Sequence, residues 1–412
     1  MTPPAPRPVD YHQRMKKVEN FVSAIELAED VATTIHAAAE AIVTEFRDEL
    51  GIYGGRLYRS DGPDYVLLAT FPDAKQVSGI RVPRTYGPIA RVLEEGTLFM
   101  DPSEPGFDRD LEATLGVEQF AAAEVANEEY LLAFNVMPGP HRDDILFSLG
   151  ILRHTLNQKL ARERMAGVFN EARIIQSSIL PKRSPVYGPY DIAGKSKPVD
   201  SVGGDFYDFI PITDKIMGLA IADVSGHGLP AALQVRDIYT GLRMGMARDF
   251  KIVRTVERLN RIIHESTLTS RFVSMFYGEL ELNGLFIYVN AGHPPPFRLR
   301  AEDGGVDFME SGGAVLGPLP QATYERGFIT LRSGDVAVLY TDGIVETVGP
   351  DSEGQYAEFG SERLIEVVRE NREQPAAEIV DAVFRAVETY GVGHAATDDR
   401  TVVVVRYPPE NA

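Results

Sequence analysis

The sequence contains no cysteine among its 412 residues. Disulfides, thiolate metal sites and cysteine nucleophiles are therefore excluded, and the absence is consistent with a reducing cytosol. Basic residues are also in deficit, with 41 Lys and Arg against 60 Asp and Glu and a formal net charge of -19. This charge disfavours nucleic acid and anionic membranes as partners, because both are polyanions, and it favours metal cations or basic protein surfaces.

Long hydrophobic runs are missing as well. The first residues have no apolar core of the kind found in secretory signals, and no run reaches the roughly 18 apolar residues of a membrane span. We therefore expect a cytoplasmic protein that does not cross a membrane. The length predicts two or three domains, and a composition of 44% hydrophobic and 25% charged residues is that of an ordinary globular protein.

The N-terminal third predicts a small sensory module. Residues 1–17 are rich in proline and polar residues, and we expect them to be disordered. Residues 18–140 begin with a helical pattern over 18–49 and continue with short strand-like runs, a helix-like segment and further apolar runs. This order predicts one α+β module. In pattern and length it resembles a GAF domain, a fold that binds a small ligand or dimerises.

Residues 141–182 predict a linker helix with two apolar seams separated by a shift of phase. The seams have heptad-like spacing and comprise Ile145, Leu149, Leu152 and Leu156, then Met165, Val168, Ala172, Ile175 and Ile179. The shift between them indicates a stutter or a break. Two interpretations stay open: an amphipathic helix that packs on its own domain, or a parallel dimer helix that links a sensor to an effector.

Residues 183–407 alternate strand-like runs with pairs of helices. The predicted helices cover 229–249, 253–268, 361–371 and 375–390. Strands followed by a helix pair, twice over, predict two sheets with helices outside, an αββα sandwich. The fold class expected for the whole chain is therefore α+β.

Acidic residues stand at predicted strand ends in four segments of this last region. They are Asp205, Asp223, Asp342 and the pair Asp398 and Asp399. One such residue alone would be an ordinary turn residue. If the strands share one edge, however, the carboxylates meet, and they cannot all ionise without a counter-charge. A hard divalent cation supplies that charge, and oxygen ligands favour Mg²⁺ or Mn²⁺ over Zn²⁺.

The motifs that carry these acids resemble those of a known enzyme family. In order they read "PVDSVGGDFYDF", "ADVSGHGLPAAL", "NAGHPPPFRL", "LYTDGIVET" and "TDDRTVVVVR". They look like the metal-dependent (PPM-type) protein serine/threonine phosphatases, in the bacterial branch named for SpoIIE, and the lead-in "IIQSSILP" is also similar to that branch. The resemblance implies two Mn²⁺ or Mg²⁺ ions whose bound hydroxide attacks phosphoserine or phosphothreonine. It also implies a STAS-type anti-anti-sigma protein as substrate. The dimer interpretation of the linker helix adds a homodimer and control of the site by the N-terminal module.

The resemblance assigns a role to each motif residue. Asp223 would bridge both ions, and the Val224 carbonyl would ligate one of them. Asp342 and Asp398 would complete the shell of the first ion. Asp205 would hold the second ion, directly or through water.

Several neighbouring residues have less definite roles. Asp399 replaces Asp398 if the register of the acidic pair is off by one. Asp208 is expected to be a surface acid or a support for the site, and His293 a turn residue. His227 either protonates the leaving oxygen or shapes its glycine-rich turn, so the general acid is not identified. By residue type alone, candidates for holding the substrate phosphate are Arg271 and Arg400.

Two other functions are compatible with parts of the sequence. The Gly-Gly-Asp run also resembles the turn of cyclic-dinucleotide synthases, but Phe206 stands where those enzymes need a glutamate. The second alternative is a catalytically weak scaffold that binds a signalling partner through the phosphatase fold.

Overall fold

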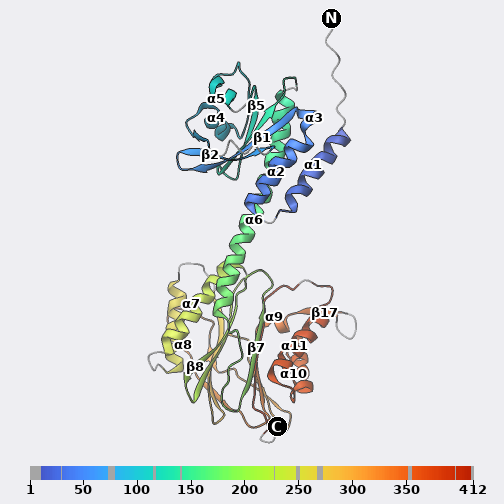
Figure 1. Cartoon of the computed structure of the whole chain (residues 1–412). Coiled ribbons are helices and arrows are strands. Elements are labelled where there is room, and N and C mark those ends of the chain that lie inside the picture. Colours follow the sequence, from blue (N-terminus) through green and yellow to red (C-terminus); the bar gives the residue numbers. More distant parts are fainter. Residues whose placement is uncertain are drawn as a thin grey trace. The chain divides into compact units, whose positions relative to one another are not determined.

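The computed structural model describes residues 11–28, 30–72, 79–114, 117–139, 142–226, 228–246, 251–266, 272–350, 355–394 and 396–409. The chain divides into two compact units, Met1–Val168 and Phe169–Ala412 (Figure 1). Within the described ranges, no helix has both the length and the apolar character needed to cross a membrane.

The N-terminal unit is built on one antiparallel sheet of six strands, in the order β3-β2-β1-β6-β5-β4. The strands are β1 (Ile52–Asp61), β2 (Asp64–Phe71), β3 (Arg81–Pro83), β4 (Thr97–Met100), β5 (Phe120–Val125) and β6 (Tyr130–Val136). The helices are α1 (Tyr11–Glu26), α2 (Val31–Glu45), α3 (Arg47–Leu50), α4 (Gly87–Glu95) and α5 (Arg109–Thr114).

The helical pattern expected over residues 18–49 forms three helices instead of one. Asp30 interrupts the helical pattern because it caps the start of α2. Its side chain accepts the backbone N–H of Thr33 at 2.9 Å, and the Thr33 hydroxyl accepts the N–H of Asp30. This capping box starts a new helix at Val31. Helical structure also begins at Tyr11, inside the segment 1–17 that was expected to be disordered.

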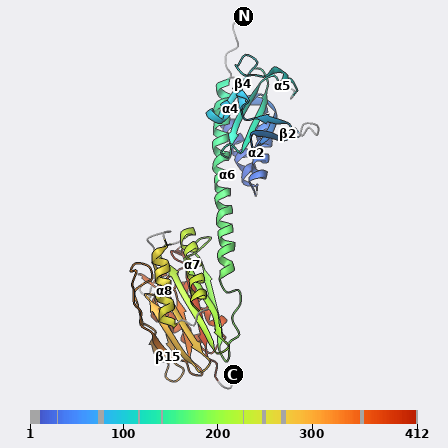
Figure 2. The ribbon, with the colours of Figure 1, turned by 90° about the vertical axis from the view of Figure 1, so that its left-hand side faces the viewer.

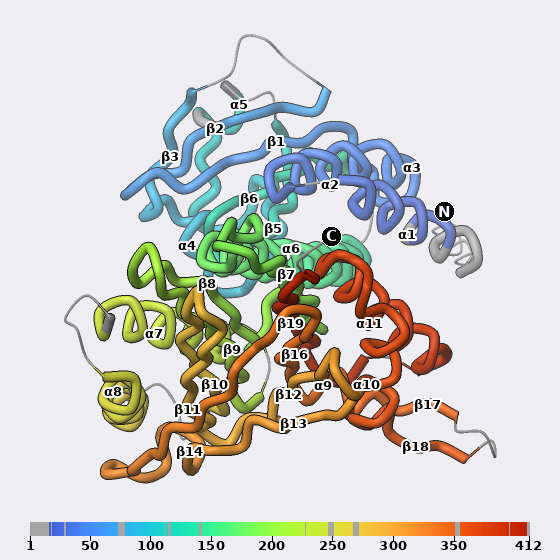
Figure 3. The backbone as a smooth tube through the Cα atoms, turned by 90° about the horizontal axis from the view of Figure 1, so that it is seen from below, coloured from blue at the N-terminus to red at the C-terminus, as the bar shows by residue number. Residues whose placement is uncertain are grey.

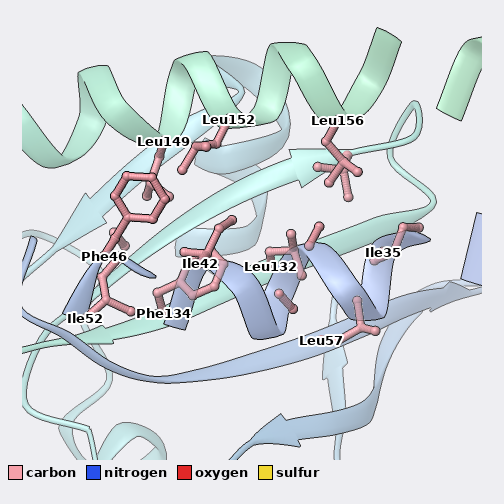
Figure 4. Close-up of a cluster of buried hydrophobic side chains, with 14 of the residues drawn as sticks. Ile35, Ile42, Phe46, Ile52, Leu57, Leu132, Phe134, Leu149, Leu152 and Leu156 are labelled. Atoms are coloured by element: carbon pink, nitrogen blue, oxygen red, sulfur yellow. The ribbon is translucent and has the colours of Figure 1, made fainter. Parts of the chain in front are cut away.

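The long helix α6 (Arg142–Ile179) has 38 residues and contains both predicted seams. The first seam is buried in the core of the N-terminal unit, where Leu149, Leu152 and Leu156 meet residues of α2 and of the sheet (Figure 4). In the second seam, the exposed fractions of Met165, Val168 and Ile175 are 63%, 55% and 61%. The seams therefore differ: the first packs on its own domain, and most of the second is exposed.

The C-terminal unit contains two sheets. In the first, the strand order is β14-β11-β10-β9-β8, with β15 also paired to β11, and in the second it is β13-β12-β16-β19-β7. The first sheet comprises β8 (Asp205–Thr213), β9 (Ile216–Val224), β10 (Val273–Glu281), β11 (Leu285–Ala291), β14 (Gly312–Gly313) and β15 (Gly327–Thr330). The second comprises β7 (Asp191–Lys197), β12 (Phe297–Leu299), β13 (Val306–Phe308), β16 (Val336–Tyr340) and β19 (Arg400–Arg406).

Helix pairs cover the outer faces of these sheets (Figure 3). Helices α7 (Leu229–Met246) and α8 (Ile252–Glu265) lie on the first sheet, as Figure 2 also shows. Helices α10 (Gly360–Asn371) and α11 (Ala376–Tyr390) lie on the second. The short elements α9 (Asp342–Val345), β17 (Val348–Pro350) and β18 (Tyr356–Glu358) precede α10. This layering agrees with the predicted αββα sandwich.

The inner faces of the two sheets share one hydrophobic core. Tyr207, Leu219 and Phe276 of the first sheet pack there with Leu339 and Val403 of the second. Side chains alternate between the two faces of a strand, so every second residue of a strand lies on the same face. A residue two positions beyond a core residue therefore also faces the space between the sheets. The end of this core is where the predicted acids lie.

Candidate metal centre

Two of the predicted acids face each other on adjacent strands. Asp205 at the start of β8 is the cross-strand partner of Asp223 near the end of β9, and Asp223 is also paired with Ser274 of β10. By strand alternation they share the inner face of the sheet with the core residues Tyr207, Ile221 and Phe276. The two carboxylates therefore lie at the end of the core between the sheets.

Asp205 ties the two sheets together at this end. Its Oδ2 atom accepts hydrogen bonds from the hydroxyls of Thr341, at 2.8 Å, and Thr401, at 2.6 Å. Both threonines belong to the second sheet or its margin, and Asp205 is fully buried. Burial and the neighbouring Asp223 raise the pKa of Asp205 well above its usual value, although the two hydroxyls oppose this.

The other acids bring uncompensated negative charge to Asp223. Asp342 begins α9 directly after β16, and Asp398 lies just before β19. Burial, then repulsion from Asp342, Asp398 and Asp399, raises the pKa of Asp223 to about 8. Burial and Asp398 also raise the pKa of Asp342. Within the described part of the chain, no ion pair with Lys, Arg or His involves Asp205, Asp223, Asp342 or Asp398.

Asp399 has a different environment from its neighbour Asp398. Its Oδ1 accepts the backbone N–H of Val199 at 2.8 Å, and its Oδ2 accepts that of Gly204 at 2.6 Å. The carboxylate is buried and holds the loop before β8. Because both of its oxygens are bonded to backbone donors, this arrangement favours Asp398 over Asp399 as a metal ligand.

The Gly-Gly run allows β8 to approach the end of β9 closely. A Cβ atom on Gly204 would lie 2.7 Å from the carbonyl oxygen of Val224 and 3.1 Å from that of Gly226. A Cβ on Gly203 would overlap the Asp399 carboxylate. The glycines are therefore required where the Val224 carbonyl, a predicted ligand, meets the strand of Asp205.

The close approach at Gly204 leads to a first prediction. Gly204→Ala should lower the free energy of unfolding by about 2 kcal/mol, because the added methyl group is forced against the Val224 carbonyl. Thermal and denaturant unfolding would measure the loss. Gly150→Ala is the control: its Cβ meets open space on α6, and it should be neutral or stabilise by up to about 1 kcal/mol. Equal stability of the two variants would contradict the steric account.

Gln176 is a residue that sequence reasoning missed. It lies on α6 within "IIQSSILP", and its buried side chain bonds to both backbone groups of Gly203. Its Oε1 accepts the Gly203 N–H at 3.1 Å, and its Nε2 donates to the Gly203 carbonyl at 2.5 Å. The end of α6 is thereby fastened to the turn that precedes Asp205. Its place in the lead-in motif was the only signal in the sequence.

The structure also places the less definite candidates. Asp208 is buried and pairs with Arg243 at 2.9 Å, so the surface interpretation was wrong. His293 is buried, shares a 2.8 Å hydrogen bond between its Nδ1 and the Ser274 hydroxyl, and has a pKa lowered to about 3 by burial. Arg400 is partly buried, and burial lowers its pKa. Two candidates lie outside the described residues: His227 and Arg271.

Comparison with known proteins identifies the C-terminal unit. Residues 213–408 match the family model of Stage II sporulation protein E (SpoIIE). The chain is 31% identical over 173 residues to the phosphoserine phosphatase RsbU of Bacillus subtilis, covering 42% of this chain and 51% of RsbU. This unit is a SpoIIE-type PP2C phosphatase domain.

Two further similarities define how far the likeness extends. The SiaA-PP2C domain of Pseudomonas aeruginosa has the same fold, with a TM-score of 0.53 and 21% identity, covering 60% of this chain and 98% of that domain. Protein IcfG of Synechocystis sp. is 25% identical over 331 residues, or 72% of this chain and 50% of IcfG. The chain thus spans about half the length of RsbU and IcfG.

The donors of the phosphatase domain fit a hydrated divalent cation. Among the residues that the structure describes, no three acidic or histidine side chains form a complete ligand set for one ion. Mg²⁺, however, commonly keeps several waters and takes only one or two carboxylates. The site offers oxygen donors alone, and the charge around Asp223 has no cationic partner among the described ion pairs. These features fit Mg²⁺ or Mn²⁺.

Proposed function

We propose that the chain is a metal-dependent protein phosphatase that hydrolyses phosphoserine or phosphothreonine in a partner protein. The observation that carries the proposal is the partly buried group of acids around Asp223, contributed by both sheets and lacking a cationic partner among the described ion pairs. Such a group is costly in a metal-free fold and is useful where divalent ions bind phosphate. The match to phosphoserine phosphatases supports the same conclusion.

Each of the four acids, together with the Val224 carbonyl, has a proposed role in holding two Mn²⁺ or Mg²⁺ ions. Asp223 is paired with Asp205 and is repelled by Asp342 and Asp398, and it would contact both ions, with the Val224 carbonyl beside it. Asp342 and Asp398 would hold one ion. One oxygen of Asp205 is already bonded to two threonines, so this acid suits contact with the second ion through water. The ions, when bound, supply an activated water and neutralise charge on the phosphoryl oxygens.

The proposed substrate is a phosphorylated STAS-type anti-anti-sigma protein. The support is the similarity to RsbU and RsbP, both named phosphoserine phosphatases. Phosphate release should be faster from such a phosphoprotein than from a short phosphoserine peptide, because a folded partner contributes binding outside the reacting group. Equal kcat/KM for both substrates would count against a dedicated protein partner.

A catalytically weak scaffold is the second candidate. The absence of a complete ligand set among the described residues is the observation that favours it. Calorimetric titration with Mn²⁺, combined with an assay of phosphate release from the phosphoprotein, separates the two functions. A phosphatase should bind the ion and turn over phosphoprotein, whereas a scaffold should bind the phosphoprotein without releasing phosphate.

Control of the site through α6 is the regulatory part of the proposal. Gln176 at the end of this helix holds Gly203, and Gly204 is bonded to Asp399 beside the acids. A movement of the last turns of α6 would therefore shift the strand of Asp205. In this proposal residues 18–140 form the GAF-like sensor and residues 141–182 the linker that transmits its state.

Gln176→Ala provides a direct test of this control. It should lower kcat about 10-fold, because Gly203 in the turn before Asp205 loses both of its hydrogen bonds to Gln176. Ser178→Ala is the control, since among the described residues its hydroxyl donates to the carbonyl of Ile175 within the same helix. A kcat equal to that of the wild type in Gln176→Ala, with unchanged thermal stability, would exclude the proposed coupling.

A homodimer formed by the second seam of α6 completes the proposal. The support is the exposure of Met165, Val168 and Ile175 at heptad-like spacing. Val168→Lys should shift the mass measured by light scattering from dimer to monomer, because it places charge in the apolar seam. Phe147→Lys, at an exposed site outside the seam, is the control. A wild-type chain that is monomeric at high concentration would refute the dimer.

A further inference from the structure

A small cavity of about 50 Å³ lies in the N-terminal unit, between the sheet and α4. Part of its floor is a row of cross-strand partners: Arg56 of β1 pairs with Ala133 of β6, which pairs with Ala122 of β5. Two adjacent alanines leave space above the strands, and Ile89 and Val92 of α4 close the other side. The register of the sheet thus creates a hollow beside a buried arginine.

The polar edge of this cavity is loosely bonded. The exposed fractions of Arg56 and Glu112 are 5% and 3%, yet the Nη1–Oε2 distance between them is 3.4 Å. Arg56 Nη1 lies 3.3 Å from the Tyr58 hydroxyl, and the Tyr86 hydroxyl lies 3.4 Å from Glu112 Oε1. Arg56 Nε has no hydrogen-bond partner among the described atoms. A buried guanidinium N–H without an acceptor is costly, so a ligand that offers an acceptor to this N–H would be stabilised here.

From this edge and this volume, we propose that the cavity binds a small neutral molecule with an amide group. The charges of Arg56 and Glu112 offset one another, so an anion or a cation would leave one charge unpaired in an apolar site. A neutral amide presents an acceptor to Arg56 and a donor to Glu112 on one edge. A dry cavity of roughly 150 Å³ holds benzene, so a ligand of only a few heavy atoms fits here.

Four probes of equal size test the chemistry on the full chain: acetamide, acetone, acetate and acetamidinium. Only acetamide is neutral and carries both a donor and an acceptor. Ligand-observed NMR titration should show saturable binding of acetamide at low millimolar concentration, about what four heavy atoms support. Intermolecular NOEs from its methyl group to Ile89 and Val92 locate it. The other three probes should bind at least about 10-fold more weakly.

Variants of the cavity separate this site from non-specific binding. Ala122→Leu fills the hollow and should abolish acetamide binding, whereas Ala32→Leu, exposed on α2, should leave it unchanged. Arg56→Lys keeps the charge but removes the guanidinium Nε, and it should weaken binding about 10-fold even if Ala122→Leu does not fold. These results would support the proposal.

Three results would overturn it. One is the absence of saturable acetamide binding to the wild-type chain, which would leave a cavity filled by water alone. Another is binding of acetate or acetamidinium equal to or tighter than that of acetamide, which would indicate a site for ions. The last is acetamide binding that persists in a folded Ala122→Leu variant. The inference concerns the N-terminal unit and does not depend on the proposed phosphatase activity.

Discussion

Asp223→Asn should reduce Mn²⁺-dependent release of phosphate from a phosphoserine peptide by about 10³-fold or more. Asp223 is the acid on which the repulsion of Asp342, Asp398 and Asp399 converges, and in the proposed arrangement it contacts both ions. The substitution removes a negative charge and keeps the shape of the side chain. The loss should appear in kcat, and higher Mn²⁺ concentrations should recover little of it.

Asp208→Asn is the matched control for this experiment. Asp208 is a buried acid on β8, the strand next to that of Asp223, and it is paired with Arg243 instead of facing other acids. Its amide variant should keep turnover within a few-fold of the wild type at a temperature where both are folded. A large loss in Asp208→Asn, or full activity in Asp223→Asn, would contradict the assignment of the ligands.

The same pair of substitutions should differ in its effect on stability without metal. In EDTA, Asp223→Asn should raise the free energy of unfolding by on the order of 2 kcal/mol, because it removes a carboxylate that burial and like charges destabilise. Asp208→Asn should change it much less, because Arg243 offsets part of the burial that raises the pKa of Asp208. With saturating Mn²⁺, the wild type and Asp208→Asn should become more stable than Asp223→Asn, because both keep the proposed ligands and gain strongly from binding.

The raised pKa of Asp223 also predicts how the free energy of unfolding without metal depends on pH. The folded chain holds the pKa of Asp223 at about 8, above its ordinary value of 3.8, so it binds more protons than the unfolded chain between these limits. The unfolding free energy contributed by this group therefore falls as the pH rises from about 4 to about 8. Denaturant unfolding in EDTA at several pH values should show this fall in the wild type and a smaller one in Asp223→Asn. An equal pH dependence in both proteins would refute the electrostatic account.

The acids of the site could be predicted from the sequence because each stands at a strand end within a motif. The register that pairs Asp205 with Asp223 follows from those strands. The contacts of Thr341 and Thr401 could not be predicted, because they form only when the two sheets pack against each other. Thr341 directly precedes Asp342, and Thr401 follows Asp399 by two residues, but local patterns do not reveal contacts between sheets.

For the linker helix, the sequence predicts the apolar seams but not which of them is buried. Its two seams look alike in the sequence, because spacing reveals an apolar face and not what covers it. The structure buries Leu149 and Leu152 in the N-terminal core and leaves Met165 and Val168 exposed. For a related reason, the sequence leaves Asp208 as either a surface acid or a support for the site, since nothing near it in the sequence indicates its pairing with Arg243 on α7.

The most direct test of the central claim is phosphate release by the full chain with Mn²⁺, Mg²⁺ or EDTA, measured for the wild type and for Asp342→Ala. The account predicts turnover with a divalent ion, none in EDTA, and a strong loss in Asp342→Ala although the variant folds. Turnover that persists in EDTA, or wild-type activity in Asp342→Ala, would contradict a metal centre built from these acids. Binding of Mn²⁺ without any turnover of phosphoprotein would contradict the phosphatase and leave the scaffold.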